Sequence, residues 1–192
     1  MAHTGRLGAA CQRHKRGFDA DGAWRHSCLL RRCVMGGIIR LAKVGEAEAL
    51  TDLSLRSKRS NGYDHAFMEA CRDELTVRPE DLADGTYWVI EDEDLAACAC
   101  LQIDRASGSG EVHSFFVDPD RKGQGIGKAL WAHLVREARQ HDLNGLVLDA
   151  DPHAVGFYQA MGCVEAGLTP SGSIPGRMLP RMHLDLGAHV LE

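Results

Sequence analysis

A glycine-dense turn between an apolar strand and an amphipathic helix is the feature that most limits the fold of this 192-residue chain. Residues 115–130 read FFVDPDRKGQGIGKAL, with glycines at positions 123, 125 and 127. Glycines let the backbone approach a ligand with its N–H groups turned outward, and the following helix adds the positive end of its dipole. The segment therefore predicts a strand–loop–helix unit that cradles a phosphate or pyrophosphate group.

Two common phosphate-binding loops do not fit this spacing. In a P-loop, Gly127-Lys128 would be followed by Ser or Thr and preceded by an earlier glycine, but the chain has Ala129 and Lys122 at those positions. The dinucleotide fingerprint, counted from Gly123, needs a glycine where Lys128 stands. The turn is therefore an anion-binding loop of another kind.

Two blocks of the sequence resemble the GNAT superfamily of N-acetyltransferases. The strand end 116–119 and the glycines at 125 and 127 resemble the acetyl-CoA loop of that family, Gln/Arg-x-x-Gly-x-Gly/Ala, with Lys122 in the place of Gln or Arg. Residues 151–163, DPHAVGFYQAMGC, resemble its Asn-x-x-Ala-x-x-Phe-Tyr-x-x-x-Gly-Phe element, with Asp151 for Asn and Cys163 for Phe. On these two blocks the chain is identified as a member of the superfamily.

The resemblance implies an α+β fold with a central, mixed, mostly antiparallel sheet flanked by helices. It also implies acetyl-CoA as co-substrate, no metal, and transfer of the acetyl group to a small-molecule or peptide primary amine by direct attack. An acyl-CoA sensor without turnover is the alternative, and a nucleotide-phosphate binding protein would rest on the glycine turn alone. The implied cofactor-binding residues are Phe115, Phe116, Val117, Lys122, Gly123, Gln124, Gly125, Ile126, Gly127, Lys128, Asp151, Phe157 and Tyr158.

The implied catalytic groups are Glu111, His113 and Tyr158. If the alternation of side chains along the strand is unbroken, Glu111 and His113 share one face with Phe115 and Val117. In the family, the positions of Glu111 and His113 relay the proton of the amine, often through water, and the tyrosine protonates the departing thiolate. A backbone N–H at a bulge near Val117 would hold the carbonyl oxygen.

Two segments are candidates for the acceptor site. Residues 57–69 carry Tyr63 and Asp64, and residues 169–180 form a loop rich in Pro and Gly that ends near Arg177. The Arg177 guanidinium suits a carboxylate on the acceptor, although a lone arginine is more often a salt-bridge partner.

Composition favours one domain that acts on small molecules. The formal net charge of -5 and pI of about 6.0 argue against nucleic acid or an anionic membrane as partner. Residues 1–34 contain seven Lys/Arg and two Asp/Glu, which predicts a disordered basic extension. A single domain is then expected over residues 35–192, and Met35 is an alternative natural start. Seven cysteines without an export signal indicate reduced thiols and a cytoplasmic location.

Hydrophobic patterns predict the remaining elements. Strands are expected at 38–42, 86–91, 95–104, 111–117, 145–150 and 178–186, and the 86–104 pair forms a hairpin. Helices are expected at 46–58 and at 64–75, the second capped by Asp64. Cys98 and Cys100 face the core together, and Pro180 lies at the start of the last strand or at an edge. The resemblance to the GNAT superfamily implies a possible homodimer that pairs through the last strands.

Overall fold

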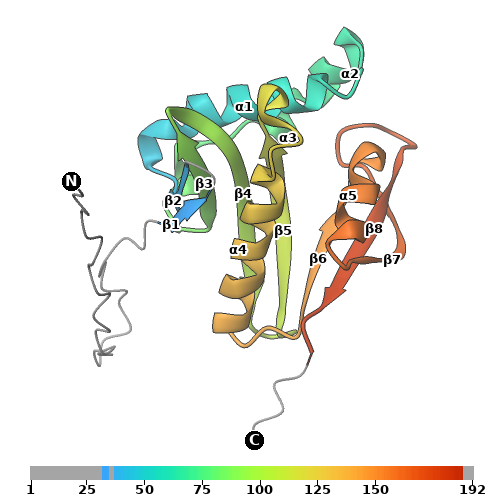
Figure 1. Cartoon of the computed structure of the whole chain (residues 1–192). Helices are drawn as coiled ribbons and strands as arrows, with labels where there is room; N and C mark the ends of the chain where they lie inside the picture. The colour runs from blue at the N-terminus through green and yellow to red at the C-terminus, as the bar shows by residue number, and fades with distance from the viewer. Residues whose placement is uncertain (1–31, 35–36, 188–192) are drawn as a thin grey trace, which may run out of the picture.

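The computed structural model describes residues 32–34 and 37–187, which form an eight-stranded sheet with helices on both faces (Figure 1). The strand order is β1-β2-β3-β4-β5-β6-β8-β7, and only the β5–β6 pair is parallel. The strands are β1 Arg32–Val34, β2 Gly37–Leu41, β3 Tyr87–Asp92, β4 Asp94–Asp104, β5 Ser109–Val117, β6 Gly145–Asp149, β7 Val164–Pro170 and β8 Met178–Asp185.

Five α-helices and four short 3-10 turns connect these strands in the described part of the chain. The helices are α1 Ala47–Arg59, α2 His65–Ala70, α3 Arg72–Leu75, α4 Ile126–Gln140 and α5 Val155–Ala160. The 3-10 turns are η1 Val44–Glu46, η2 Pro79–Leu82, η3 Pro119–Arg121 and η4 Pro152–Ala154. None of the helices in the described ranges is long and apolar enough to cross a membrane.

Two apolar layers hold the helices on opposite faces of the sheet. Helices α4 and α5 pack against one face through Leu130, Leu134 and Tyr158, which contact buried residues of the central strands. Helix α1 packs against the other face, where Leu50 and Leu53 meet Cys98 and its neighbours. The spacing of the leucines on α1 and α4 places them on one side of each helix, so burying that side stabilises both.

The parallel pair β5–β6 positions the candidate site. The two strands are paired only from Ser109 opposite Gly145 to Glu111 opposite Val147, although β5 continues to Val117. In Figure 1 they meet at the lower end and diverge toward α1 and α5. Beyond Glu111, the facing edges of β5 and β6 do not hydrogen-bond to each other. This opening between the strands lies beside the N-terminus of α4.

Most of the expected elements are present, with the mixed and mostly antiparallel sheet confirmed. The helix expected over 64–75 is broken at Cys71 into α2 and α3. Its cap is confirmed, because the Asp64 carboxylate accepts a hydrogen bond from the Phe67 backbone N–H at 2.8 Å. Cys98 and Cys100 are buried, as expected. Pro180 is the third residue of β8, an inner strand between β6 and β7, rather than a first residue or an edge residue.

The first described element is β1. Residues 32–34, which the charge pattern places in the basic extension, pair antiparallel with β2 through Arg32 opposite Ile39. The expected extension and the alternative start depend on residues 1–31 and on Met35. These residues lie outside the described part of the chain.

Candidate active site

The glycine loop forms the start of α4 and offers backbone N–H groups to an anion. Gly123 and Gly125 have φ of +79° and +81°, a region that disfavours side chains, and no atoms lie within 4 Å of a Cβ added at either. Gly125 is the N-cap, and the first backbone hydrogen bond of the helix runs from Ala129 N–H to its carbonyl. The N–H groups of the first turn of α4 precede this bond and have no carbonyl partner within the helix, an arrangement suited to hold a pyrophosphate.

The third glycine serves packing instead. A Cβ at Gly127 would lie 3.4 Å from Val117 Cγ2 and 3.5 Å from Phe157 Cε2. This glycine lets the first turn of α4 lie close to β5 and α5, so the loop is held beside the end of β5. Val117 and Phe157 thus support the loop, and Ile126 is buried beneath it.

The polar side chains around the loop are mostly engaged with the protein. Lys122 Nζ donates to Ser60 Oγ at 2.7 Å, which ties the loop to the end of α1. Gln124 Nε2 donates to the Asp120 carbonyl at 3.3 Å, whereas the Lys128 side chain is exposed on the first turn of α4. Lysines at both ends of the loop add positive charge for an anionic ligand.

A β-bulge in β5 breaks the alternation expected from the sequence. Cys98 pairs with Phe116 and Cys100 pairs with His113, so Ser114 and Phe115 together oppose Ala99. Ser114 absorbs the extra residue with φ of +51°. The expectation of one shared face is therefore wrong for Phe115 and Val117, which both pack on the α4 side; Phe115 contacts Trp131 and Tyr158 there. The bulge expected near Val117 is present, at Ser114 and Phe115.

Because of the same bulge, Phe116 lies on the face that carries His113, opposite Phe115. It packs against the cluster under α1 and the cluster of α2 and α3. The two phenylalanines thus fix β5 between the two layers, and the edge of β5 that is not paired with β6 carries backbone donors at the bulge. Donors fixed in this way are suited to hold a carbonyl oxygen that becomes negative.

Glu111 and His113 lie together before the bulge. The distance between Glu111 Oε2 and His113 Nε2 is 3.7 Å. Sequence reasoning missed a third member, Arg181 of β8, whose Nη2 lies 3.4 Å from Glu111 Oε1 and whose Nη1 donates to Asp149 at 2.9 Å. Only the pairing of β6 with β8 brings Arg181 to this position. All three side chains of this group are partly exposed and accessible to an acceptor.

Tyr158 approaches from the other side of the sheet. It lies on α5 with its ring against Phe115, Trp131 and Phe157, at centroid distances of 6.0, 5.4 and 5.2 Å. Burial raises the pKa of the Tyr158 hydroxyl well above its ordinary value, and the nearby Cys163 and Asp151 add to the shift. The phenol is therefore protonated at neutral pH and able to donate its proton.

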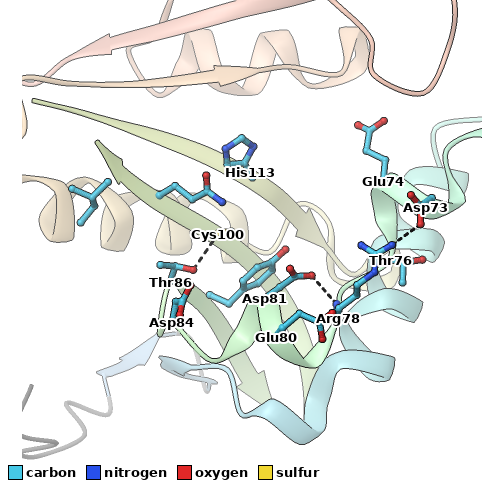
Figure 2. A pocket seen from close by; sticks show the side chains of 13 residues that line it. Asp73, Glu74, Thr76, Arg78, Glu80, Asp81, Asp84, Thr86, Cys100 and His113 are labelled. Atoms are coloured by element: carbon cyan, nitrogen blue, oxygen red, sulfur yellow. Dashed lines mark hydrogen bonds and ion pairs between the residues drawn. The ribbon is translucent and has the colours of Figure 1, made fainter. Parts of the chain in front are cut away.

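An acidic groove opens beside His113 on the face that carries α1 to α3, with a volume of about 630 Å³. Figure 2 shows acidic side chains of α3 and η2 around the space that His113 borders. Five carboxylates line it against a single arginine, Arg78, which is paired with Asp73 at 2.6 Å. The lining residues are Asp73, Glu74, Thr76, Arg78, Glu80, Asp81, Asp84, Thr86, Tyr87, Cys100, Gln102, Ile103 and His113.

Tyr63, Asp64 and Arg177, which the sequence suggests for the acceptor, do not line this groove. Asp64 is exposed and caps α2. Tyr63 and Arg177 both contact Asp151, which the sequence assigns to the cofactor; Arg177 Nη2 donates to Tyr63 Oη at 2.7 Å. Arg177 is thus a salt-bridge partner of Asp151. This is the role that a lone arginine more often has. Among the described residues, no cluster of His, Cys, Asp and Glu is arranged to hold a metal ion.

Comparisons with known proteins point to one family. The model of the acetyltransferase (GNAT) family matches residues 48–163, more than half of the chain. The peptidyl-lysine N-acetyltransferase YjaB of Salmonella typhimurium is 32% identical over 150 residues, which cover 76% of this chain and 95% of YjaB. The uncharacterized N-acetyltransferase ycf52 of Gracilaria tenuistipitata is 42% identical over 58 residues, 30% of this chain and 32% of that relative, so the chain spans about a third of its length.

A solved structure shows the same fold. The PaiA N-acetyltransferase from Thermoplasma acidophilum, in complex with coenzyme A, superposes with a TM-score of 0.61 at 15% sequence identity. The match covers 77% of this chain and 97% of that chain. At this identity the likeness establishes the arrangement of strands and helices, and the residues of the site have to be argued from their own geometry.

Proposed function

The chain belongs to the GNAT family of acetyltransferases, and we propose that it transfers an acetyl group from acetyl-CoA to a primary amine by direct attack. The observation that carries the proposal is that the glycine loop, the bulge of β5, Tyr158 and the Glu111–His113 pair all lie where β5 and β6 part. When bound, acetyl-CoA supplies the acetyl group as a thioester. The name of YjaB, a peptidyl-lysine N-acetyltransferase, agrees with an amine acceptor.

The chain fits acetyl-CoA through backbone rather than through charged side chains. The open space at Gly123 and Gly125 admits a pyrophosphate to the N–H groups at the start of α4. The pantetheine arm would then lie along the unpaired edges of β5 and β6, where backbone donors and acceptors are available to its amides.

Direct attack is favoured because the nearby thiol is a poor nucleophile. Burial raises the pKa of the Cys163 thiol to about 11, so the thiolate is scarce at neutral pH. The acceptor itself needs a base, since an alkylamine has a pKa of about 10.4. The Glu111–His113 pair is placed to take that proton, directly or through water, and Tyr158 is placed to protonate the leaving sulfur.

The acidic groove supports an acceptor that carries positive charge beyond its reacting nitrogen. Carboxylates of α3 and η2 would attract a cation and orient it toward His113, and would disfavour an acceptor with a carboxylate. They would also stabilise the ammonium form of the acceptor, which increases the need for a base. We therefore propose a linear diamine, a polyamine or a lysine side chain in a basic peptide as the acceptor class.

An assay of thiol release from acetyl-CoA with a panel of amines tests the function. We expect spermidine or a basic lysine peptide to give a higher kcat/KM than a monoamine, and the advantage to fall as ionic strength rises. The double variant Glu80→Gln/Asp84→Asn should reduce that advantage. A preference for acidic amino acids would overturn the acceptor class, and the absence of thiol release with every amine would overturn the enzyme assignment.

We also propose that two copies of the chain pair through the edge of the sheet formed by β7. β7 is an edge strand, and Val164, Leu168 and Met178 of β7 and β8 are exposed apolar side chains. An edge with unpaired backbone groups and apolar side chains favours association. Light scattering after size exclusion should give twice the chain mass, and Leu168→Lys should return the monomer; a monomeric wild type would contradict the pairing.

A further inference from the structure

The Asp151 carboxylate, at the end of β6, gathers side chains from three other segments of the chain. Lys58 Nζ of α1 donates to Oδ2 at 2.6 Å, and Tyr63 Oη, from the segment between α1 and α2, lies 3.0 Å from both carboxylate oxygens. Arg177 Nη2, from the loop between β7 and β8, lies 3.6 Å from Oδ2. Asp151 also accepts the backbone N–H of His153 at 3.0 Å. We call Lys58, Tyr63, Asp151 and Arg177 the clasp.

Arg177 is held by aromatic rings as well as by charge. Its guanidinium carbon lies 4.8 Å from the centre of the Phe67 ring and 5.2 Å from that of Tyr63. The two rings are themselves stacked at 4.0 Å. A guanidinium on an aromatic face, with a hydrogen bond to Tyr63 Oη, has little freedom to turn toward a ligand.

The charges of the clasp are shielded from solvent. The side chains of Lys58, Asp151 and Arg177 are only 15%, 12% and 17% exposed. Burial by itself raises the pKa of the Asp151 carboxyl, but the hydrogen bond and charge of Lys58 and the N–H of His153 outweigh it, and the net pKa lies below the usual value. Both cations therefore depend on one ionised carboxylate, and without it they would be left shielded and unpaired.

A second set of contacts holds the other end of the β7–β8 loop. The Ser173 hydroxyl donates to the Glu74 carboxylate of α3, and Ile174 packs on the cluster formed by Met68, Cys71 and Leu75. The loop over residues 171–177 thus bridges from α3 to the end of β6. It lies on the side of the sheet that carries α1 to α3, with the acidic groove at the α3 end.

We propose that Asp151 is a positioning residue, which fastens the β7–β8 loop to the α1–α2 segment and so forms one wall of the acceptor entrance. This role replaces the contact with the pantetheine arm that the family motif implies at this position. Its negative charge also offsets one of the two positive charges of Lys58 and Arg177, which reduces their repulsion of a cationic acceptor. The inference rests on the proposed function for its kinetic readout only.

Limited trypsin digestion tests the clasp without any activity. Trypsin cleaves after Arg177 only when its side chain is released, and intact mass identifies the fragment 178–192. We expect Asp151→Asn, which keeps the shape and can still accept the His153 N–H, to accelerate this cleavage roughly tenfold. Asp149→Asn, the same substitution two residues earlier on β6 and outside the clasp, is the matched control. Equal cleavage rates in the two variants and the wild type would overturn the clasp.

A second variant protects the test against misfolding of Asp151→Asn. Tyr63→Phe removes the hydroxyl that joins Asp151 to Arg177 but keeps the ring stack on Phe67. It leaves the buried charges in place, so the fold should persist while cleavage after Arg177 accelerates. A Tyr63→Phe protein that is cleaved as slowly as the wild type would also contradict the clasp.

Kinetics separate positioning from cofactor binding. With acetyl-CoA and spermidine or a basic lysine peptide as probes, Asp151→Asn should raise the acceptor KM several-fold and leave the Kd of acetyl-CoA unchanged. A weakened Kd of acetyl-CoA with an unchanged acceptor KM would make Asp151 a cofactor ligand instead. The Arg177→Met change should add little to Asp151→Asn if Arg177 acts through the clasp, and full additivity would place Arg177 on the acceptor. If wild type binds no acetyl-CoA, the proposed function fails while the digestion result stands.

Discussion

Glu111 and His113 lie on the same face of β5, with 3.7 Å between Glu111 Oε2 and His113 Nε2, because both precede the bulge at Ser114. The bulge then returns Phe116 to the face of His113 and puts Phe115 on the side of α4. The Glu111–His113 pair and the phenol of Tyr158 therefore lie on different sides of the sheet. In the proposed reaction, the acceptor and the cofactor would enter from different directions.

Removal of the base should impair the reaction most at low pH. We expect His113→Gln to lower kcat/KM at pH 7 by about 10²-fold, a usual contribution of a general base. Since solution hydroxide deprotonates the amine as the pH approaches about 10, the deficit should shrink there. A pH–rate profile measures this, with the exposed His65→Gln as control. A deficit that is independent of pH would exclude His113 as the base.

Removal of the Tyr158 hydroxyl should affect turnover and not binding. The hydroxyl is protonated because burial raises its pKa, and Tyr158→Phe keeps the ring contacts with Phe115 and Trp131. We expect kcat to fall by about 10²-fold with an unchanged Kd for acetyl-CoA. Single-turnover rates and calorimetric titration measure the two quantities. A large loss of affinity would mean that the phenol binds the cofactor rather than protonates its sulfur.

A side chain at Gly125 should weaken cofactor binding through the backbone. This residue has φ of +81° and no neighbours within 4 Å of an added Cβ, so Gly125→Ala introduces strain without a clash. The loop should relax to another conformation, with the Kd of acetyl-CoA raised about tenfold. Gly45→Ala is the control, because Gly45 has equal open space and no positive φ. Equal affinities in both variants would separate the loop from pyrophosphate binding.

The buried ion pair of Arg40 should stabilise the sheet edge. Arg40 is 5% exposed and bonds to Glu46 at 2.6 Å and Glu91 at 2.7 Å. Arg40→Met removes the charged hydrogen bonds to both carboxylates and should cost about 2 kcal/mol of unfolding free energy, measured by urea denaturation. Arg72→Met, which removes an exposed pair with Glu69, should cost less than about 1 kcal/mol. Similar losses in the two variants would contradict the argument from burial.

The Arg40–Glu46 pair should also affect how the free energy of unfolding falls at acidic pH. The hydrogen bond from Arg40 lowers the pKa of Glu46 below its ordinary value of about 4.5. A carboxyl with a depressed folded pKa contributes its full stability above the unfolded value and loses it as the pH falls through the folded one. The wild type should therefore lose stability below about pH 4.5, and Arg40→Met should show a smaller loss over that range. Urea midpoints from pH 3 to pH 7 give the comparison.

The sequence predicted what depends on local spacing. The glycines at 123, 125 and 127, the cap at Asp64 and the apolar stripes of α1 and α4 could be read from neighbours in the chain, because turns, caps and helix faces are set within a few residues. The break between α2 and α3 at Cys71 could not, since the apolar pattern continues through it.

Cross-strand contacts decided the rest of the site. The bulge at Ser114 depends on how β5 registers against β4, and only that register separates Phe115 from His113. Arg181 reaches Glu111 because β8 inserts between β6 and β7. Asp151 meets Lys58, Tyr63 and Arg177 over sequence separations that no local pattern records.

The chain by itself thus determined the family, the anion-binding loop and the identity of the candidate acid and base, because these follow from residue types at fixed short spacing. Tertiary structure alone decided which of those side chains share a face, which are committed to each other and where the acidic groove lies. The physical reason is that strand register and loop docking are settled by packing between segments that are distant in sequence.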